Sequence, residues 1–225
     1  MEKKINRHDD ANSQYQYIND KATIFIKNAQ PVISIDIEKM PKDFSVKALE
    51  KVVPYGIIDK NTGFIDLGTC EDNSKFVVES ILRWWQILGK NTYPDAKEIL
   101  IIGSDEERNV TGERLWKKQL QDLASITKLK IYVTHFPPLG MFKWNKIEHK
   151  MFCLINRNWK NKTFCIETVI SLVSNTGANG ITIKYIDDKS TYKLSRKVTD
   201  EEFEKIKIEY EEFHGKWNYC VSPSE

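Results

Sequence analysis

Apolar positions form short uninterrupted runs and helical stripes that follow one another along the chain. Runs at 31–36, 98–105 and 130–133 are dominated by apolar residues and predict buried strands. Two more strands, at 52–59 and 63–69, are predicted on either side of a turn that contains asparagine and glycine. The pattern therefore indicates a sheet that begins with antiparallel strands and continues with parallel ones.

Helical stripes fill the intervals between these strands. A largely buried helix is expected over 74–88, with Gly89 as its C-terminal cap, because its apolar residues cover more than one face. A second helix is expected over 112–127. A charged amphipathic helix is expected over 200–213, because Thr199 and the glutamate three residues later form a capping box.

From residue 31 the predicted order is strand, hairpin, helix, strand, helix, strand and helix. This order is typical of an α/β protein with a mixed sheet flanked by helices. We expect three regions: a polar and helical lead-in at 1–30, the α/β core at 31–160, and a C-terminal helical extension at 161–225. Within this extension, residues 180–185 alternate as a strand does.

Composition and charge exclude several classes of protein. Of the 225 residues, 40% are hydrophobic and 29% are charged, which is ordinary for a globular protein. The net charge of +2 does not by itself indicate nucleic-acid binding, so any basic surface must be local. No apolar run is long enough to cross a bilayer and no signal peptide is recognised, so we expect a cytoplasmic protein with no membrane partner. The cysteines form no C-x-x-C pair, so reduced thiols are expected rather than a zinc site or disulfides.

Three acidic residues stand at the ends of predicted elements or just after them. Asp36 and Asp105 end two strands, and Glu148 lies on a helix that follows the third. Carboxylates that converge in this way bind Mg²⁺ or Mn²⁺, because these ions prefer hard oxygen ligands. Two such ions can activate a water or a 3′-hydroxyl and stabilise the leaving oxygen of a phosphodiester. In the alternative interpretation Asp36 caps a turn and the acids are surface decoration.

A basic and aromatic group of residues surrounds Glu148. Their helix begins after two prolines that end the strand at 130–133. The side chains expected to hold a DNA backbone there are Lys143, Trp144, Asn145, Lys146 and His149. The same spacing also fits an amphipathic helix with a buried stripe and a solvated charged face.

Seven short motifs extend over nearly the whole chain in a fixed order. They are QPVISID at 30–36, PYG at 54–56, VESILRWW at 78–85, RLWK at 114–117, HFPP at 135–138, KWNKIEH at 143–149 and FHGKWNY at 213–219. Together they resemble the catalytic half of bacterial insertion-sequence transposases with a DDE, RNase H-like domain, of the Rhodopirellula-type group. The resemblance implies an RNase H-like fold, with Asp36 as the first metal-binding acid and Glu148 as the third. It also implies metal-dependent cleavage and transfer of DNA strands at transposon ends, by a protein that works as a homo-oligomer.

The sequence departs from the family pattern at the second acid. When the motif at 114–117 is used as the anchor, the family's acid falls at Ser104, whereas the acidic residue here is Asp105. Neighbouring residues of a strand point to opposite faces, so this offset could aim the Asp105 carboxylate away from the site unless the strand end bends. The interval between Asp36 and Pro54 is also short, which predicts that one strand of the sheet is missing. Two interpretations stay open: an active transposase domain, or an inactive, partly degenerate remnant that keeps the fold and weak DNA binding.

Overall fold

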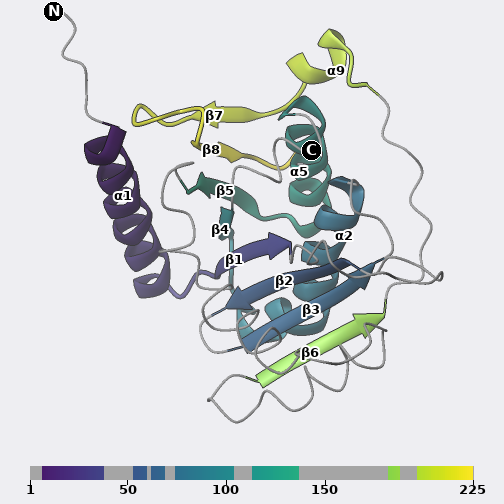
Figure 1. Cartoon of the computed structure of the whole chain (residues 1–225). Helices are drawn as coiled ribbons and strands as arrows, with labels where there is room; N and C mark the ends of the chain where they lie inside the picture. The colour runs from purple at the N-terminus through teal and green to yellow at the C-terminus, as the bar shows by residue number, and fades with distance from the viewer. Residues whose placement is uncertain are drawn as a thin grey trace, which may run out of the picture.

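The computed structural model of the chain describes residues 7–37, 53–59, 62–68, 74–103, 113–136, 182–187 and 197–224 (Figure 1). In chain order its elements are α1 (Arg7–Lys27), β1 (Val32–Ile37), β2 (Val53–Asp59), β3 (Thr62–Gly68), α2 (Ser74–Trp84), the π-helix η1 (Trp85–Gly89), α3 (Lys90–Thr92), β4 (Glu98–Gly103), α5 (Glu113–Thr127), β5 (Lys130–His135), β6 (Thr182–Asp187), α9 (Asp200–Glu204), β7 (Ile208–Tyr210) and β8 (Asn218–Val221).

The described strands form one eight-stranded mixed sheet in the order β6-β3-β2-β1-β4-β5-β8-β7. Strands β1, β2 and β3 pair antiparallel, and β4 and β5 continue the sheet from β1 in parallel. The prediction of an α/β, RNase H-like sheet flanked by helices is therefore confirmed. The expected loss of one strand before Pro54 is not seen, because the described residues supply all five strands of the RNase H-like arrangement β3-β2-β1-β4-β5.

The C-terminal part of the chain adds strands to both edges of this arrangement. Strand β6 pairs with β3 at one edge, and β8 pairs with β5 at the other, where β7 follows it. Among the described residues of 161–225, the five-residue α9 is the helix and three strands join the sheet. The strand predicted at 180–185 is confirmed by β6, whereas β7 lies where the sequence predicted helix. The hairpin of β7 and β8 covers the edge of β5, which would otherwise present unpaired backbone groups.

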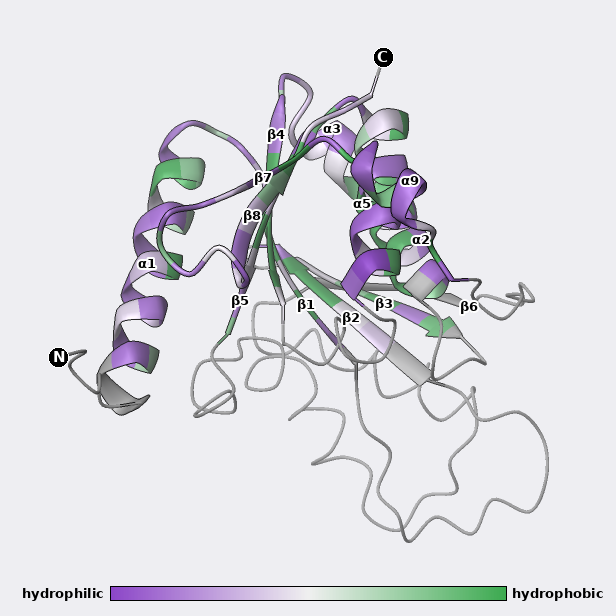
Figure 2. Ribbon diagram, turned by 90° about the horizontal axis from the view of Figure 1, so that it is seen from above, coloured by the Kyte–Doolittle hydropathy of each residue, from purple (hydrophilic) through white to green (hydrophobic). Residues whose placement is uncertain are grey.

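The two faces of the sheet pack against different helices (Figure 2). Helices α2 and α5 lie on one face, where the larger apolar core includes the buried rings of Trp84 and Trp116. Helix α1 lies on the other face, where Phe25 packs with Leu100 and Ile102 of β4. Both faces of the central parallel strands are therefore covered, as their uninterrupted apolar sequences predict.

Gly89 lies inside a continuous helical segment and not at its C-terminal cap. Helix α2 continues through η1 into α3, and the φ of Gly89 is −59°. The sequence predicted a cap because glycine is the usual residue after a helix. A Cβ at this position would lie 2.5 Å from Cε3 of Trp85 and 2.9 Å from Cζ3 of Trp84. The glycine is therefore needed to make room for two tryptophan rings.

The capping box at Thr199 is confirmed, but the helix that it begins is short. Oγ1 of Thr199 accepts from the Glu202 N–H at 3.2 Å, and Oε2 of Glu202 accepts from the Thr199 N–H at 3.1 Å. The sequence predicted a helix over 200–213, whereas α9 ends at Glu204. The apolar residues Ile206 and Ile208 also fit the two-residue period of a strand, and pairing with β8 decides between the two structures.

Candidate active site at the carboxyl ends of the central strands

Asp36 is the next-to-last residue of β1, a strand in the interior of the sheet. It pairs with Gly56 of β2, which contributes no side chain beside it. Ile33 and Ile35 of the same strand are buried in the core under α2 and α5, so Asp36 faces the side of the sheet on which α1 lies. The residue is partly exposed. Asp36 therefore offers a hard oxygen ligand close to the carboxyl end of β1, and it fits the chemistry of a magnesium or manganese site.

Strand β4 runs parallel to β1, so that the carboxyl ends of both strands meet at one edge of the sheet. Ser34 pairs with Ile102, and Ile102 packs in the core under α1. Ile101 packs in the opposite core, under α2 and α5. Even-numbered positions of β4 thus share a face with Asp36, and odd-numbered positions do not. The strand ends at Gly103, and Ser104 and Asp105 lie outside the described residues.

The end of β5 lies beside the end of β4. His135, the last residue of β5, pairs with Gly103, and the N–H of Phe136 donates to the Gly103 carbonyl oxygen at 3.0 Å. The His135 ring lies on the α5 side, where its Nε2 is 3.4 Å from the hydroxyl oxygen of Tyr219. The same oxygen accepts from the indole N–H of Trp116 at 2.7 Å. The HFPP motif therefore begins at a residue that is anchored to α5 and β8.

The other predicted site residues lie outside the described part of the chain. They are Asp105 and Glu148, and the expected DNA-binding residues Lys143, Trp144, Asn145, Lys146 and His149. Within the described ranges, no three histidine, cysteine, aspartate or glutamate residues gather as a metal site. Of the predicted metal-binding acids, the structure therefore places Asp36.

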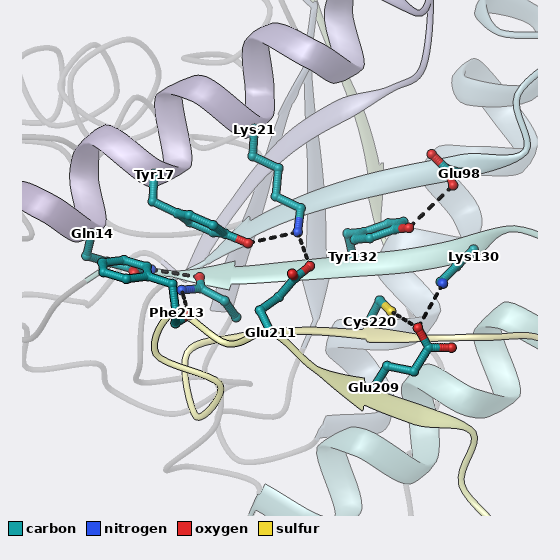
Figure 3. Close-up of polar contacts among 11 residues, drawn as sticks. Gln14, Tyr17, Lys21, Glu98, Lys130, Tyr132, Glu209, Glu211, Phe213 and Cys220 are labelled. Atoms are coloured by element: carbon teal, nitrogen blue, oxygen red, sulfur yellow. Dashed lines mark hydrogen bonds and ion pairs between the residues drawn. The ribbon is translucent and has the colours of Figure 1, made fainter.

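A row of polar side chains crosses the α1 face at β5, β8 and β7 (Figure 3). Lys21 of α1 forms an ion pair with Glu211, and its ammonium group lies 2.9 Å from the Tyr17 hydroxyl. Burial lowers the pKa of Lys21, but the hydrogen bonds to Glu211 and Tyr17 outweigh it, so the pKa is raised overall. Further along the row, the hydrogen bond from Lys130 lowers the pKa of Glu209. The contact of Lys21 connects α1 to the residues after β7, and the contact of Lys130 connects β5 to β7.

The comparison with protein families gives a match over most of the chain. Residues 37–223 match the family described as the Rhodopirellula transposase DDE domain. This chain belongs to that family. The match to this transposase family begins one residue after Asp36. Comparisons with curated proteins and with solved structures gave no match.

The main feature of the transposase domain that the sequence did not predict is the docking of α1. Its buried residues Gln14, Ile18, Ala22 and Phe25 recur at helical spacing, and this stripe is the signal that could have revealed it. Gln14 is fully buried and contacts the end of β5. A polar residue in an apolar stripe was therefore the sign of a specific buried contact. No helix in the described part of the domain is long and apolar enough to cross a membrane.

Proposed function

We propose that this domain cleaves and transfers DNA strands at transposon ends, with Asp36, Asp105 and Glu148 as ligands of Mg²⁺ or Mn²⁺. The observation that carries the proposal is the position of Asp36, on an interior strand and beside a parallel strand whose sequence continues into an acidic residue. Family membership supports the transposase function. Bound metal would activate a water or a 3′-hydroxyl for attack on a phosphodiester and stabilise the leaving oxygen.

The DNA would be held by the basic and aromatic residues around Glu148. Lys143, Lys146 and His149 would contact phosphates, and Trp144 and Asn145 would support them by packing and hydrogen bonding. The domain would act in the cytoplasm, on DNA ends that are paired by a homo-oligomer. Such contacts release counterions, so the affinity for DNA should fall as the salt concentration rises.

One observation favours a second candidate, a domain that keeps the fold but not a complete metal site. Ser34 pairs with Ile102, and both face the α1 side of the sheet with Asp36. Two residues further on each strand, the sequence has Asp36 on β1 and Ser104 after β4. If the strand alternation continued, the family position of the second acid would therefore face Asp36 with a serine hydroxyl. The Asp105 carboxylate would then face the other side.

Two substitutions distinguish an active domain from an inactive one. Nicking of a supercoiled plasmid in Mn²⁺ is compared for the wild type, Ser104→Asp and Asp105→Ala. For an active site that uses Asp105, we expect cleavage by the wild type and a loss of at least about 100-fold in Asp105→Ala, because removal of a metal-holding acid removes transition-state charge stabilisation. Cleavage by Ser104→Asp alone, with an inactive wild type, would contradict the proposal and establish the second candidate.

A further inference from the structure

The last residue of β5 is held through its main chain from two directions. The N–H of His135 donates to the Trp217 carbonyl oxygen at 3.0 Å, and its own carbonyl oxygen accepts from Nε2 of Gln14 at 2.9 Å. The pairing of β5 with β8 ends one residue earlier, at Thr134 and Asn218. A side-chain amide from α1 therefore satisfies the first carbonyl group beyond the part of β5 that pairs with β8.

The side-chain amides of Gln14 and Asn218 bond to each other in both directions (Gln14 is labelled in Figure 3). Nε2 of Gln14 donates to Oδ1 of Asn218 at 2.8 Å, and Nδ2 of Asn218 donates back to Oε1 of Gln14 at 2.8 Å. The second hydrogen of the Asn218 amide goes to the Phe213 carbonyl oxygen at 2.9 Å. Both side chains are fully buried. Such a closed network specifies one arrangement, because each displaced group would be buried without a partner.

The position of this network links it to the carboxyl ends of the central strands. His135 lies beside Gly103, and Phe136 bonds to the Gly103 carbonyl oxygen. In the sequence, the chain continues from here through the two prolines toward Glu148. The Gln14–Asn218 pair therefore fixes the point from which the chain leaves β5.

We propose that Gln14 is a positioning residue of the DNA-processing site and acts through the main chain of His135. This inference rests on the proposed function, and it deepens it by assigning a role to α1, which precedes the family match at 37–223. A misplacement of about 1 Å at a reacting centre can cost about 100-fold in rate. Loss of the Gln14 amide therefore lowers the turnover of DNA cleavage and leaves the affinity for DNA unchanged.

The test compares Gln14→Met with Gln16→Met and with a double swap, Gln14→Asn combined with Asn218→Gln. Gln16 lies on the same helix but is exposed and bonds to Asp20, so its variant is a matched control. The swap exchanges the lengths of the two side chains and keeps both amides. Plasmid nicking in Mn²⁺ gives kcat and KM, and amide hydrogen exchange is followed at His135, Phe136 and the core residue Leu100.

We expect Gln14→Met to lower kcat at least 10-fold with KM unchanged, and to accelerate exchange at His135 and Phe136 at least 10-fold more than at Leu100. The double swap should restore a large part of kcat and of the slow exchange at His135 and Phe136. Gln16→Met should resemble the wild type in both measurements. If Gln14→Met keeps the kcat of Gln16→Met, the inference is overturned and the proposed function stands. If the wild type does not cleave, the proposed function fails, and the exchange data alone decide whether Gln14 fixes the end of β5: equal acceleration at all three amides would overturn it.

Discussion

Buried polar side chains in this domain are paired across elements that are distant in the sequence. The buried Asp66 of β3 forms an ion pair with Arg83 of α2, with 2.6 Å between Nη2 and Oδ2. The buried Asp59 of β2 accepts from the Tyr93 hydroxyl at 2.8 Å. Burial, followed by the hydrogen bond to Asp59, raises the pKa of Tyr93. Since buried charge without a partner is costly, these pairs set the relative positions of the helices and strands that carry them.

Gly89→Ala is expected to destabilise the domain by about 1–3 kcal/mol, as overpacked core positions do. Alanine is the better helix former by about 1 kcal/mol, but its Cβ would meet both tryptophan rings. Urea denaturation measures the difference, with Lys90→Ala as an exposed control in the next helix that should stay within about 0.5 kcal/mol of the wild type. A more stable Gly89→Ala protein would show that the rings adjust without cost.

Single residues also show the limit of sequence reasoning. The composition of 74–88 predicted a buried helix correctly, but Gly89 alone could not reveal whether it ends the helix or accommodates its neighbours. That distinction depends on where two tryptophan rings lie in three dimensions. For Asp105, the sequence allows only the general rule that neighbouring strand residues point to opposite faces. The structure adds which face of the sheet each residue of β4 points to, as far as Ile102.

Helix α1 is the element whose role changes most between sequence and structure. Its sequence is rich in polar residues and predicted only a polar and helical lead-in at 1–30, whereas one helix extends from Arg7 to Lys27 and docks on the sheet. Tertiary contacts, rather than local preference, stabilise such a helix. In addition to the Gln14 network, its contacts include the Lys21–Glu211 ion pair and the pair of His214 and Asp10, whose Nε2 and Oδ1 are 2.7 Å apart.

Lys21→Met should weaken the docking of α1 at neutral pH but not in strong alkali. The pKa of Lys21 is raised above its ordinary value of 10.5 in the folded protein, so its contribution is fully present below that value. It is lost as the pH rises through the folded-state pKa. We expect the variant to be about 1 kcal/mol less stable at pH 8, a typical value for such a contact, and the difference to shrink above pH 10.5.

Urea denaturation from about pH 8 to about pH 11.5 tests this expectation, because this range includes the ordinary lysine pKa of 10.5. Lys27→Met is the control, because Lys27 is exposed on the same helix. Tyrosines ionise over this range in the unfolded state of both proteins, so the informative quantity is the difference between wild type and variant. A difference that stays constant with pH would rule out a contribution from the charge of Lys21.

At the scale of the whole molecule, the five central strands were predictable, and the pairing at the two edges of the sheet was not. Uninterrupted apolar runs and the turn after β2 identify β1 to β5, and the helices between later strands require parallel pairing. The sequence predicted β6 as a strand but not its pairing with β3, which is far away in sequence, and it predicted helix where β7 lies. The candidate site could be predicted as a set of residue types, and of its three acids the structure places Asp36, near the carboxyl end of β1.

Titration with Mn²⁺ reports on the whole metal site. If Asp36, Asp105 and Glu148 converge, metal at 100 times its dissociation constant should stabilise the folded state by about 2.7 kcal/mol. This would appear as a rise in Tm that is lost in Glu148→Ala and retained in Glu204→Ala, a control on the exposed side of α9. Absence of a shift at millimolar Mn²⁺ in the wild type would mean that the site is incomplete.

The Gln14–Asn218 contact also has a consequence for biosynthesis. Its two partners are 204 residues apart in the chain. Ribosomes add about 5–20 residues per second, so about 10–40 s pass between the synthesis of Gln14 and that of Asn218. During this interval α1 exists without the partner for its buried amide, and in its last part, after His135 has been added, β5 exists without its neighbour β8. The nascent chain therefore completes this end of its sheet late, and a chaperone that shields the edge of β5 would find its substrate in that interval.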